Sequence, residues 1–123
     1  MQIESARELN VYTLAYELAM TIFEISKTFP SEEKYALTSQ IRRSSRSVCL
    51  NLREAWRRYE PNFISKLTHC DGENNETDTS LDFAKDCGYI PSKQHEALIA
   101  KCAEIGRMLG GMMKKSDSFI LSE

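Results

Sequence analysis

The residues best suited to bind another molecule lie in the segment 42–58, where six arginines fall within 17 residues: Arg42, Arg43, Arg46, Arg53, Arg57 and Arg58. At about 100° per residue along a helix, Arg42, Arg46, Arg53 and Arg57 project within a sector of about 60°, and we call these four the arginine ridge. A row of guanidinium groups can contact several phosphates at once, and the neighbouring Trp56 can stack on a base. The ridge, with Arg43, Trp56 and Arg58, is therefore a candidate nucleic-acid-binding surface.

An acidic segment offers the arginines a second kind of partner. Residues 69–82 contain no Lys or Arg but several carboxylates, namely Asp71, Glu73, Glu76, Asp78 and Asp82. The arginines can pair with these carboxylates within the chain or across a contact between subunits. Ion pairing and nucleic-acid binding are therefore alternative interpretations of the same arginines. Under the ion-pair interpretation, the candidate interface residues are Glu73, Asn74, Glu76 and Asp78.

Metal-dependent and nucleophilic catalysis lack a specific pattern in this sequence. Metal sites in helical bundles that are bridged by carboxylates use Glu-x-x-His on two helices, whereas Lys66 precedes His69 and Ser92 precedes His95 at that spacing. Glycine-rich phosphate loops, GxSxG, HExxH and paired CxxC motifs are also absent. We therefore expect a protein that is not an enzyme, with no catalytic residues, no metal site and no cofactor.

Length, charge and cysteine spacing set the broad class. A chain of 123 residues with 41% hydrophobic residues fits one domain over residues 1–123. Its formal charge of −2 gives no indication of nucleic-acid binding by net charge alone. No apolar run reaches the roughly 20 residues needed to cross a bilayer, and no cleavable signal is recognisable. The widely spaced cysteines predict free thiols in a cytoplasmic protein; they are Cys49, Cys70, Cys87 and Cys102.

Apolar residues recur every three or four positions in four segments, which predicts an all-α fold. The expected helices cover about 10–29, 33–59, 61–87 and 92–115, with a tail at 116–123. The third segment is polar over 69–80, so this stretch is either helix or loop, and continuity of the register favours helix. Gly88 suits the position just after a helix, and Gly106 indicates close packing of another helix. Short corners predict an antiparallel up-down-up-down four-helix bundle.

The order of motifs along the chain is also familiar. Glu8-Leu9-Asn10-Val11-Tyr12, the TSQIRR run at 38–43, Gly88-Tyr89-Ile90 and the EIGRML run at 104–109 resemble the four-helix-bundle proteins encoded in intervening sequences of bacterial 23S ribosomal RNA genes. The resemblance covers the chain to about residue 113. It implies a closed four-helix bundle that assembles into a ring-shaped homopentamer without known enzymatic activity.

The chain is similar, too, to the accessory bundle protein of diversity-generating retroelements, a pentamer whose basic surface is implicated in binding nucleic acid and reverse transcriptase. Together with the arginines, these resemblances lead us to expect a non-catalytic module that binds structured RNA or a ribonucleoprotein. The alternative is a structural or adaptor homo-oligomer, in which the arginines pair with the acidic third helix across subunits and a protein is the partner. We expect no membrane partner.

Overall fold

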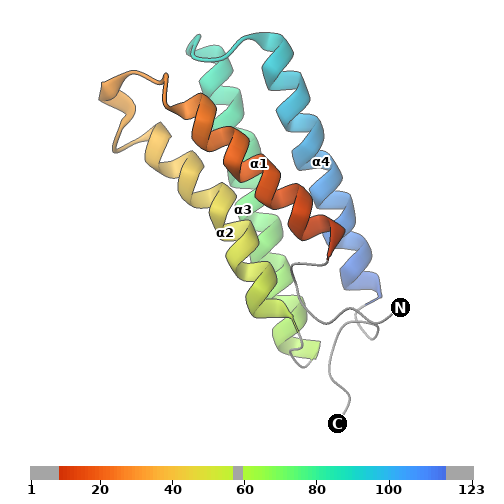
Figure 1. Cartoon of the computed structure of the whole chain (residues 1–123). Helices are drawn as coiled ribbons and strands as arrows, with labels where there is room; N and C mark the ends of the chain where they lie inside the picture. Colours follow the sequence, from red (N-terminus) through yellow and green to blue (C-terminus); the bar gives the residue numbers. More distant parts are fainter. Residues whose placement is uncertain (1–8, 57–59, 116–123) are drawn as a thin grey trace.

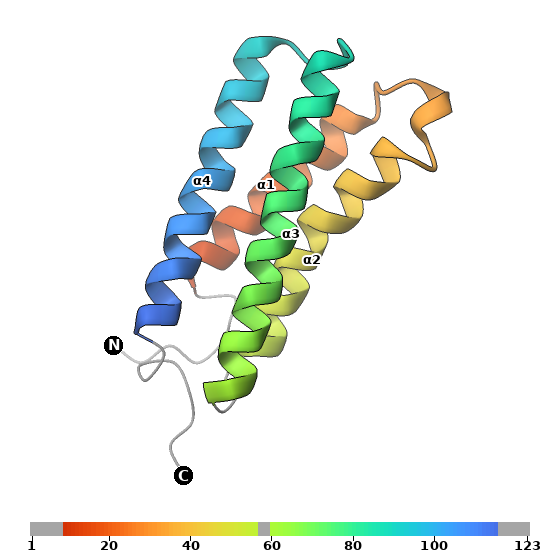
Figure 2. The same cartoon turned by 180° about the vertical axis from the view of Figure 1, so that it is seen from behind.

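The chain folds as four helices packed around one core, in a computed structural model that describes residues 9–56 and 60–115. The helices are α1 (Asn10–Ser26), α2 (Leu37–Ala55), α3 (Glu60–Asp86) and α4 (Ser92–Lys114), and a short 3₁₀ turn, η2 (Ser31–Glu33), precedes α2. Successive helices run antiparallel, and α1 returns against α4 to close the bundle (Figures 1 and 2). The described ranges contain four helices and no strand, as the periodicity predicts.

The corner between α1 and α2 is longer than expected, since α1 ends at Ser26 and not at Phe29. Amides 27–29 donate to carbonyl groups three residues back, at 3.2–3.3 Å, so the chain tightens ahead of Pro30, which cannot donate a hydrogen bond. Phe29 then turns inward and packs on Tyr89 with ring centroids 5.4 Å apart. The corner is thereby anchored to the core.

Helix α2 begins at Leu37, four residues later than the expected Glu33. The backbone of Ala36 leaves the helical region, with φ −119° and ψ −105°, and separates α2 from the 3₁₀ turn. Glu33 links the start of α2 to the segment after α3, because its carboxylate accepts hydrogen bonds from the Leu37 amide at 3.3 Å and from the Tyr89 hydroxyl at 2.8 Å. At the other end α2 stops at Ala55; residues 57–59, to which the expected helix extended, lie outside the described residues.

The polar middle of the third segment is helical, because α3 runs unbroken through it. Asn74 and Thr77 continue the buried stripe between Cys70 and Leu81. The Thr77 hydroxyl shares a hydrogen bond of 2.8 Å with Ser44 of α2, and the Asn74 amide donates to the Cys102 carbonyl of α4 at 2.8 Å. Partners on both neighbouring helices therefore make a polar interior tolerable.

Two kinds of glycine occur near the ends of α3 and α4. Gly88 has φ +80°, and the Tyr89 amide behind it donates to Ala84 at 2.8 Å, so Gly88 ends α3 in the left-handed conformation that the sequence predicts. At Gly106 an added Cβ would meet the Asn74 amide at an ordinary 3.7 Å, and at Gly111 it would meet nothing within 4 Å. Among the glycines of the described helices, only Gly106 therefore has another helix beside it, and the contact is an ordinary one.

No helix in the described ranges combines the length and the apolar character needed to cross a lipid bilayer.

We predict opposite effects of alanine at two glycines. Gly111→Ala should raise the free energy of unfolding by about 0.5–1 kcal/mol, because a helical glycine is entropically costly and the space is open. Gly88→Ala should lower it by about 1–2 kcal/mol, because L residues are strained at positive φ. Urea unfolding followed by circular dichroism, at one fixed protein concentration, measures both. A loss of stability in Gly111→Ala would contradict the open space and indicate a second molecule packed on that face.

Candidate nucleic-acid interface

The arginines of α2 divide into an engaged and an open group, and Arg42 belongs to the first. Its Nε donates to the Ser26 hydroxyl at 2.7 Å and its terminal nitrogen to the Phe23 carbonyl at 3.5 Å. The guanidinium also lies over the Phe23 ring, 4.9 Å from the centroid. These contacts tie α2 to the end of α1, so Arg42 acts mainly as a clasp within the bundle.

Arg43 is engaged with the acidic helix of its own chain. It pairs with Glu73 at 3.1 Å and with Glu76, so two of the carboxylates predicted to face the arginines do so, within a single chain. The hydrogen bond to Glu76 is the main cause that raises the pKa of the Arg43 guanidinium, and the charge of Glu73 adds to it. The side chain keeps 53% of its surface exposed, which limits the energy of the pair.

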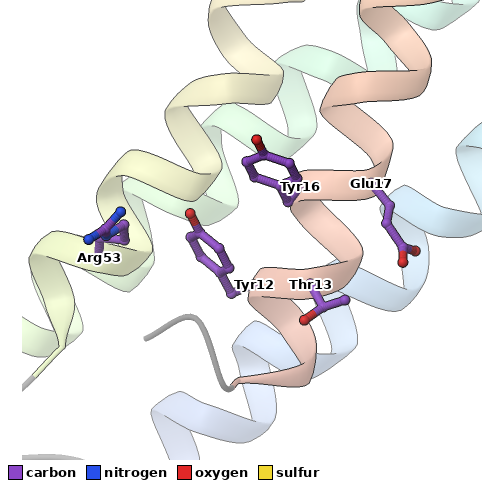
Figure 3. A pocket seen from close by; sticks show the side chains of 5 residues that line it. All are labelled: Tyr12, Thr13, Tyr16, Glu17 and Arg53. Atoms are coloured by element: carbon purple, nitrogen blue, oxygen red, sulfur yellow. The ribbon is translucent and has the colours of Figure 1, made fainter. Parts of the chain in front are cut away.

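Arg46 and Arg53 form the open group. Both are exposed, and in the part of the chain that the structure describes neither forms an ion pair with a carboxylate. The Arg46 guanidinium lies over the Phe23 ring, 5.6 Å from the centroid, and its outer edge remains available. Arg53 stands opposite Tyr12 across the space between α2 and α1 (Figure 3).

The remaining predicted nucleic-acid-binding residues are Trp56, Arg57 and Arg58. Trp56, predicted to stack on a base, is only partly exposed and packs against the core. Its indole is therefore a less accessible platform than expected. Arg57 and Arg58 lie outside the described residues.

The candidate interface residues of α3 lie mostly in contact with their own chain. Asn74 is a correction to the prediction, because it is buried between α3 and α4 and so cannot meet another subunit. Glu73 and Glu76 are partly covered by Arg43. Asp78 is half-buried, and burial, followed by the charge of Asp82, raises the pKa of its carboxyl, whereas His95 opposes this rise.

A groove between α1 and α2 completes the surface, and sequence reasoning missed it. The two helices lie close at the corner and diverge toward the start of α1 (Figures 1 and 2). The space between them has a volume of about 350 Å³ and is lined by Tyr12, Tyr16, Ala19, Met20, Arg46, Cys49, Leu50 and Arg53. The sequence feature that could have indicated the groove is the spacing of Tyr12 and Tyr16, which places two aromatic rings one helical turn apart.

Large apolar side chains are exposed around this groove. Tyr16 is 53% exposed, Met20 47% and Leu50 61%, and all three line it. A surface that gathers apolar and cationic groups is suited to contact another molecule. Two further large apolar residues are exposed elsewhere, Tyr35 just before α2 and Phe83 on α3.

No group of three or more metal-ligating side chains gathers among the described residues. His95 is buried and pairs with Asp82 at 2.7 Å. Cys49, Cys70 and Cys102 are buried. Cys87 is exposed, because α3 ends there and the helix face that carried the core stripe stops. The cysteines are free thiols.

Comparisons with known proteins agree on one relationship. The family model described as 23S rRNA-intervening sequence protein matches residues 7–111. A crystal structure of a protein of unknown function from the S23 ribosomal protein family, from Bacteroides thetaiotaomicron, is 31% identical and superposes with a TM-score of 0.77, covering 85% of this chain and 95% of the other. No curated protein matches the chain.

The thiols should differ in reactivity. Burial raises the pKa of Cys49 to about 11 and of Cys70 and Cys102 to about 12, which leaves little thiolate at pH 8. Iodoacetamide should therefore label Cys87 first and the others only after unfolding, as mass spectrometry of peptides would show. Cys87→Ser should abolish the fast labelling. Fast labelling of Cys70 or Cys102 in the folded protein would contradict the burial.

The ion pairs of Arg43 should contribute modestly to stability. Arg43→Ala should lower the free energy of unfolding by about 0.5–1 kcal/mol at low salt and by less at high salt, as for partly exposed pairs. Arg107→Ala, which removes an exposed arginine of α4, is the matched control and should stay within about 0.5 kcal/mol of the parent. Equal effects of the two variants at low salt would show that the pairs contribute nothing.

Proposed function

The chain belongs to the family of 23S rRNA-intervening sequence proteins, and from this premise we propose that it is a non-catalytic module that binds RNA or a ribonucleoprotein through the open part of the arginine ridge. The observation that carries the proposal is the exposure of Arg46 and Arg53 without a carboxylate partner among the described residues. In this proposal the two guanidinium groups bind and orient phosphates, and the chain carries out no catalytic step.

The division of the arginines supports this function. Arg42 and Arg43 use their hydrogen-bonding capacity inside the bundle, whereas the guanidinium groups of Arg46 and Arg53 donate to no acceptor among residues 9–56 and 60–115. Guanidinium groups bind phosphate through paired N–H donors, and an arginine that no carboxylate neutralises keeps its full attraction for an anion. A polyanion is therefore the ligand that best complements this part of the surface.

A homo-oligomer is the second candidate, and it is favoured by the exposed apolar side chains. Tyr16, Met20 and Leu50 line the groove together with the open arginines, while Phe83 is exposed on α3, near the exposed acids Asp82 and Asp86 in the sequence. Two different complementary patches on one chain can join copies head to tail, and such contacts form a ring when the rotation between copies closes. In this second candidate, which would place these side chains in a contact between copies, the ring is a homopentamer, as the family resemblance implies, and it acts in the reducing cytoplasm where free thiols persist.

We predict that charge reversal at the open arginines weakens RNA binding. For the double variant Arg46→Glu/Arg53→Glu, binding to a labelled ribosomal RNA fragment should weaken about tenfold or more, because two phosphate contacts become repulsive. The affinity of the parent should fall steeply as salt rises. Fluorescence anisotropy across a salt series measures both effects, and light scattering reports the mass of each variant.

Arg107→Glu is the matched control, since it makes the same charge change on an exposed arginine of α4. It should retain parental binding. If the parent does not bind RNA at low salt, the proposed function is wrong. If the double variant loses both binding and assembly, the arginines serve the subunit contact, which supports the second candidate instead.

A further inference from the structure

We propose that the groove between α1 and α2 takes up an unpaired base of single-stranded RNA, with Tyr16 as the stacking surface and Arg46 and Arg53 holding the flanking phosphates. This inference rests on the proposed function and specifies its ligand. Four features of the groove lead to it: its aromatic wall, its apolar floor, its volume and its cationic rim.

The aromatic wall comes from α1. The rings of Tyr12 and Tyr16 stack on each other, with centroids 6.1 Å apart and planes at 30°. Both side chains reach from α1 toward α2, whereas Glu17 points away (Figure 3). Tyr12 is half-buried and supports the pair, and Tyr16 is 53% exposed. Tyr16 therefore offers a ring that is already oriented by its neighbour, as in platforms on which bases of single strands stack.

The floor of the groove suits a flat, largely apolar ring. Its buried lining residues are Ala19 and Cys49, and Met20 and Leu50 line it as exposed apolar side chains. Its volume of about 350 Å³ lies within the about 300–1,000 Å³ that small-molecule sites occupy. Burial raises the pKa of the Cys49 thiol to about 11, so that side chain is neutral and presents no negative charge to an RNA base.

The rim of the groove carries the positive charge. Arg46 and Arg53 line it, and its described lining includes no carboxylate. Arg53 follows Arg46 by seven positions, which places the two about two turns and about 10 Å apart along α2. Phosphates on either side of an inserted base can therefore each meet one guanidinium group, while the base itself lies between them.

The placement of the ring favours an unpaired base over a duplex. In a helix of paired bases each base face is covered by the next pair, so a protein ring cannot reach it without unstacking. Loops, bulges and ends leave base faces open, and these are the parts of structured RNA that proteins recognise by stacking. Surface charge alone would not distinguish the two forms in this way.

The test compares Tyr16→Ala with Tyr16→Phe, using a single-stranded RNA of 12 nucleotides and its perfect duplex as probes. Loss of one stacked base should weaken single-strand binding about fivefold to tenfold, and Phe, which keeps the ring, should restore most of it. A 2-aminopurine in the strand should be quenched by the parent and much less by Tyr16→Ala. Phe83→Ala removes an exposed aromatic ring of α3 and is the matched control.

The outcomes separate this inference from the function on which it rests. If Tyr16→Ala binds like the parent while Arg46→Glu/Arg53→Glu does not, the arginines bind RNA but the groove takes no base, and the inference is overturned. Equal affinity for duplex and single strand overturns it as well. If Tyr16→Ala changes the mass of the assembly, the groove is a contact between copies. Failure of the parent to bind either probe removes the proposed function itself.

Discussion

The bundle depends on hydrogen bonds that polar side chains at the centre of α3 form with both neighbouring helices. Asn74 and Thr77 stand where the apolar register requires buried residues, and each finds a partner on a different neighbouring helix. Leaving a buried polar group without a partner costs more stability than its hydrogen bond contributes. Helices α2 and α4 must therefore be positioned along α3 so that Ser44 reaches Thr77 and the Cys102 carbonyl reaches Asn74. The relative register of three helices is thereby set by two short contacts.

The same register determines which arginines of α2 remain available. Once Ser44 faces Thr77, Arg43 one residue earlier lies over Glu73 and Glu76 and pairs with both. Arg42 points to the other side and reaches Ser26 and Phe23 of α1. Arg46 and Arg53 lie farther along the helix and form no ion pair with a carboxylate of the described residues. An arrangement that stabilises the interior thus leaves a positive surface at one end of the α1–α2 pair.

Much of the fold is predictable from the sequence because the apolar periods, Pro30, Pro61 and Gly88 mark four helices and their corners. The helix ends near residues 26 and 37 were not predictable, because they depend on the tightened turn before Pro30 and on the Glu33 carboxylate. The arginine cluster was recognisable from its spacing. Its division into engaged and open members was not, because the partners Ser26, Glu73 and Glu76 belong to other helices. The Tyr12–Tyr16 wall was missed because one tyrosine pair within an amphipathic helix resembles ordinary packing.

Phe23 has a consequence for how tightly an anion can be held. Its ring lies beneath both Arg42 and Arg46, at 4.9 and 5.6 Å, so the flexible Arg46 side chain already rests on an aromatic surface. Immobilising such a side chain on binding costs about 0.5–1.5 kcal/mol. Here much of that conformational entropy is lost when the chain folds, before any ligand arrives. The cation is preorganised, and the complex it forms is correspondingly favoured.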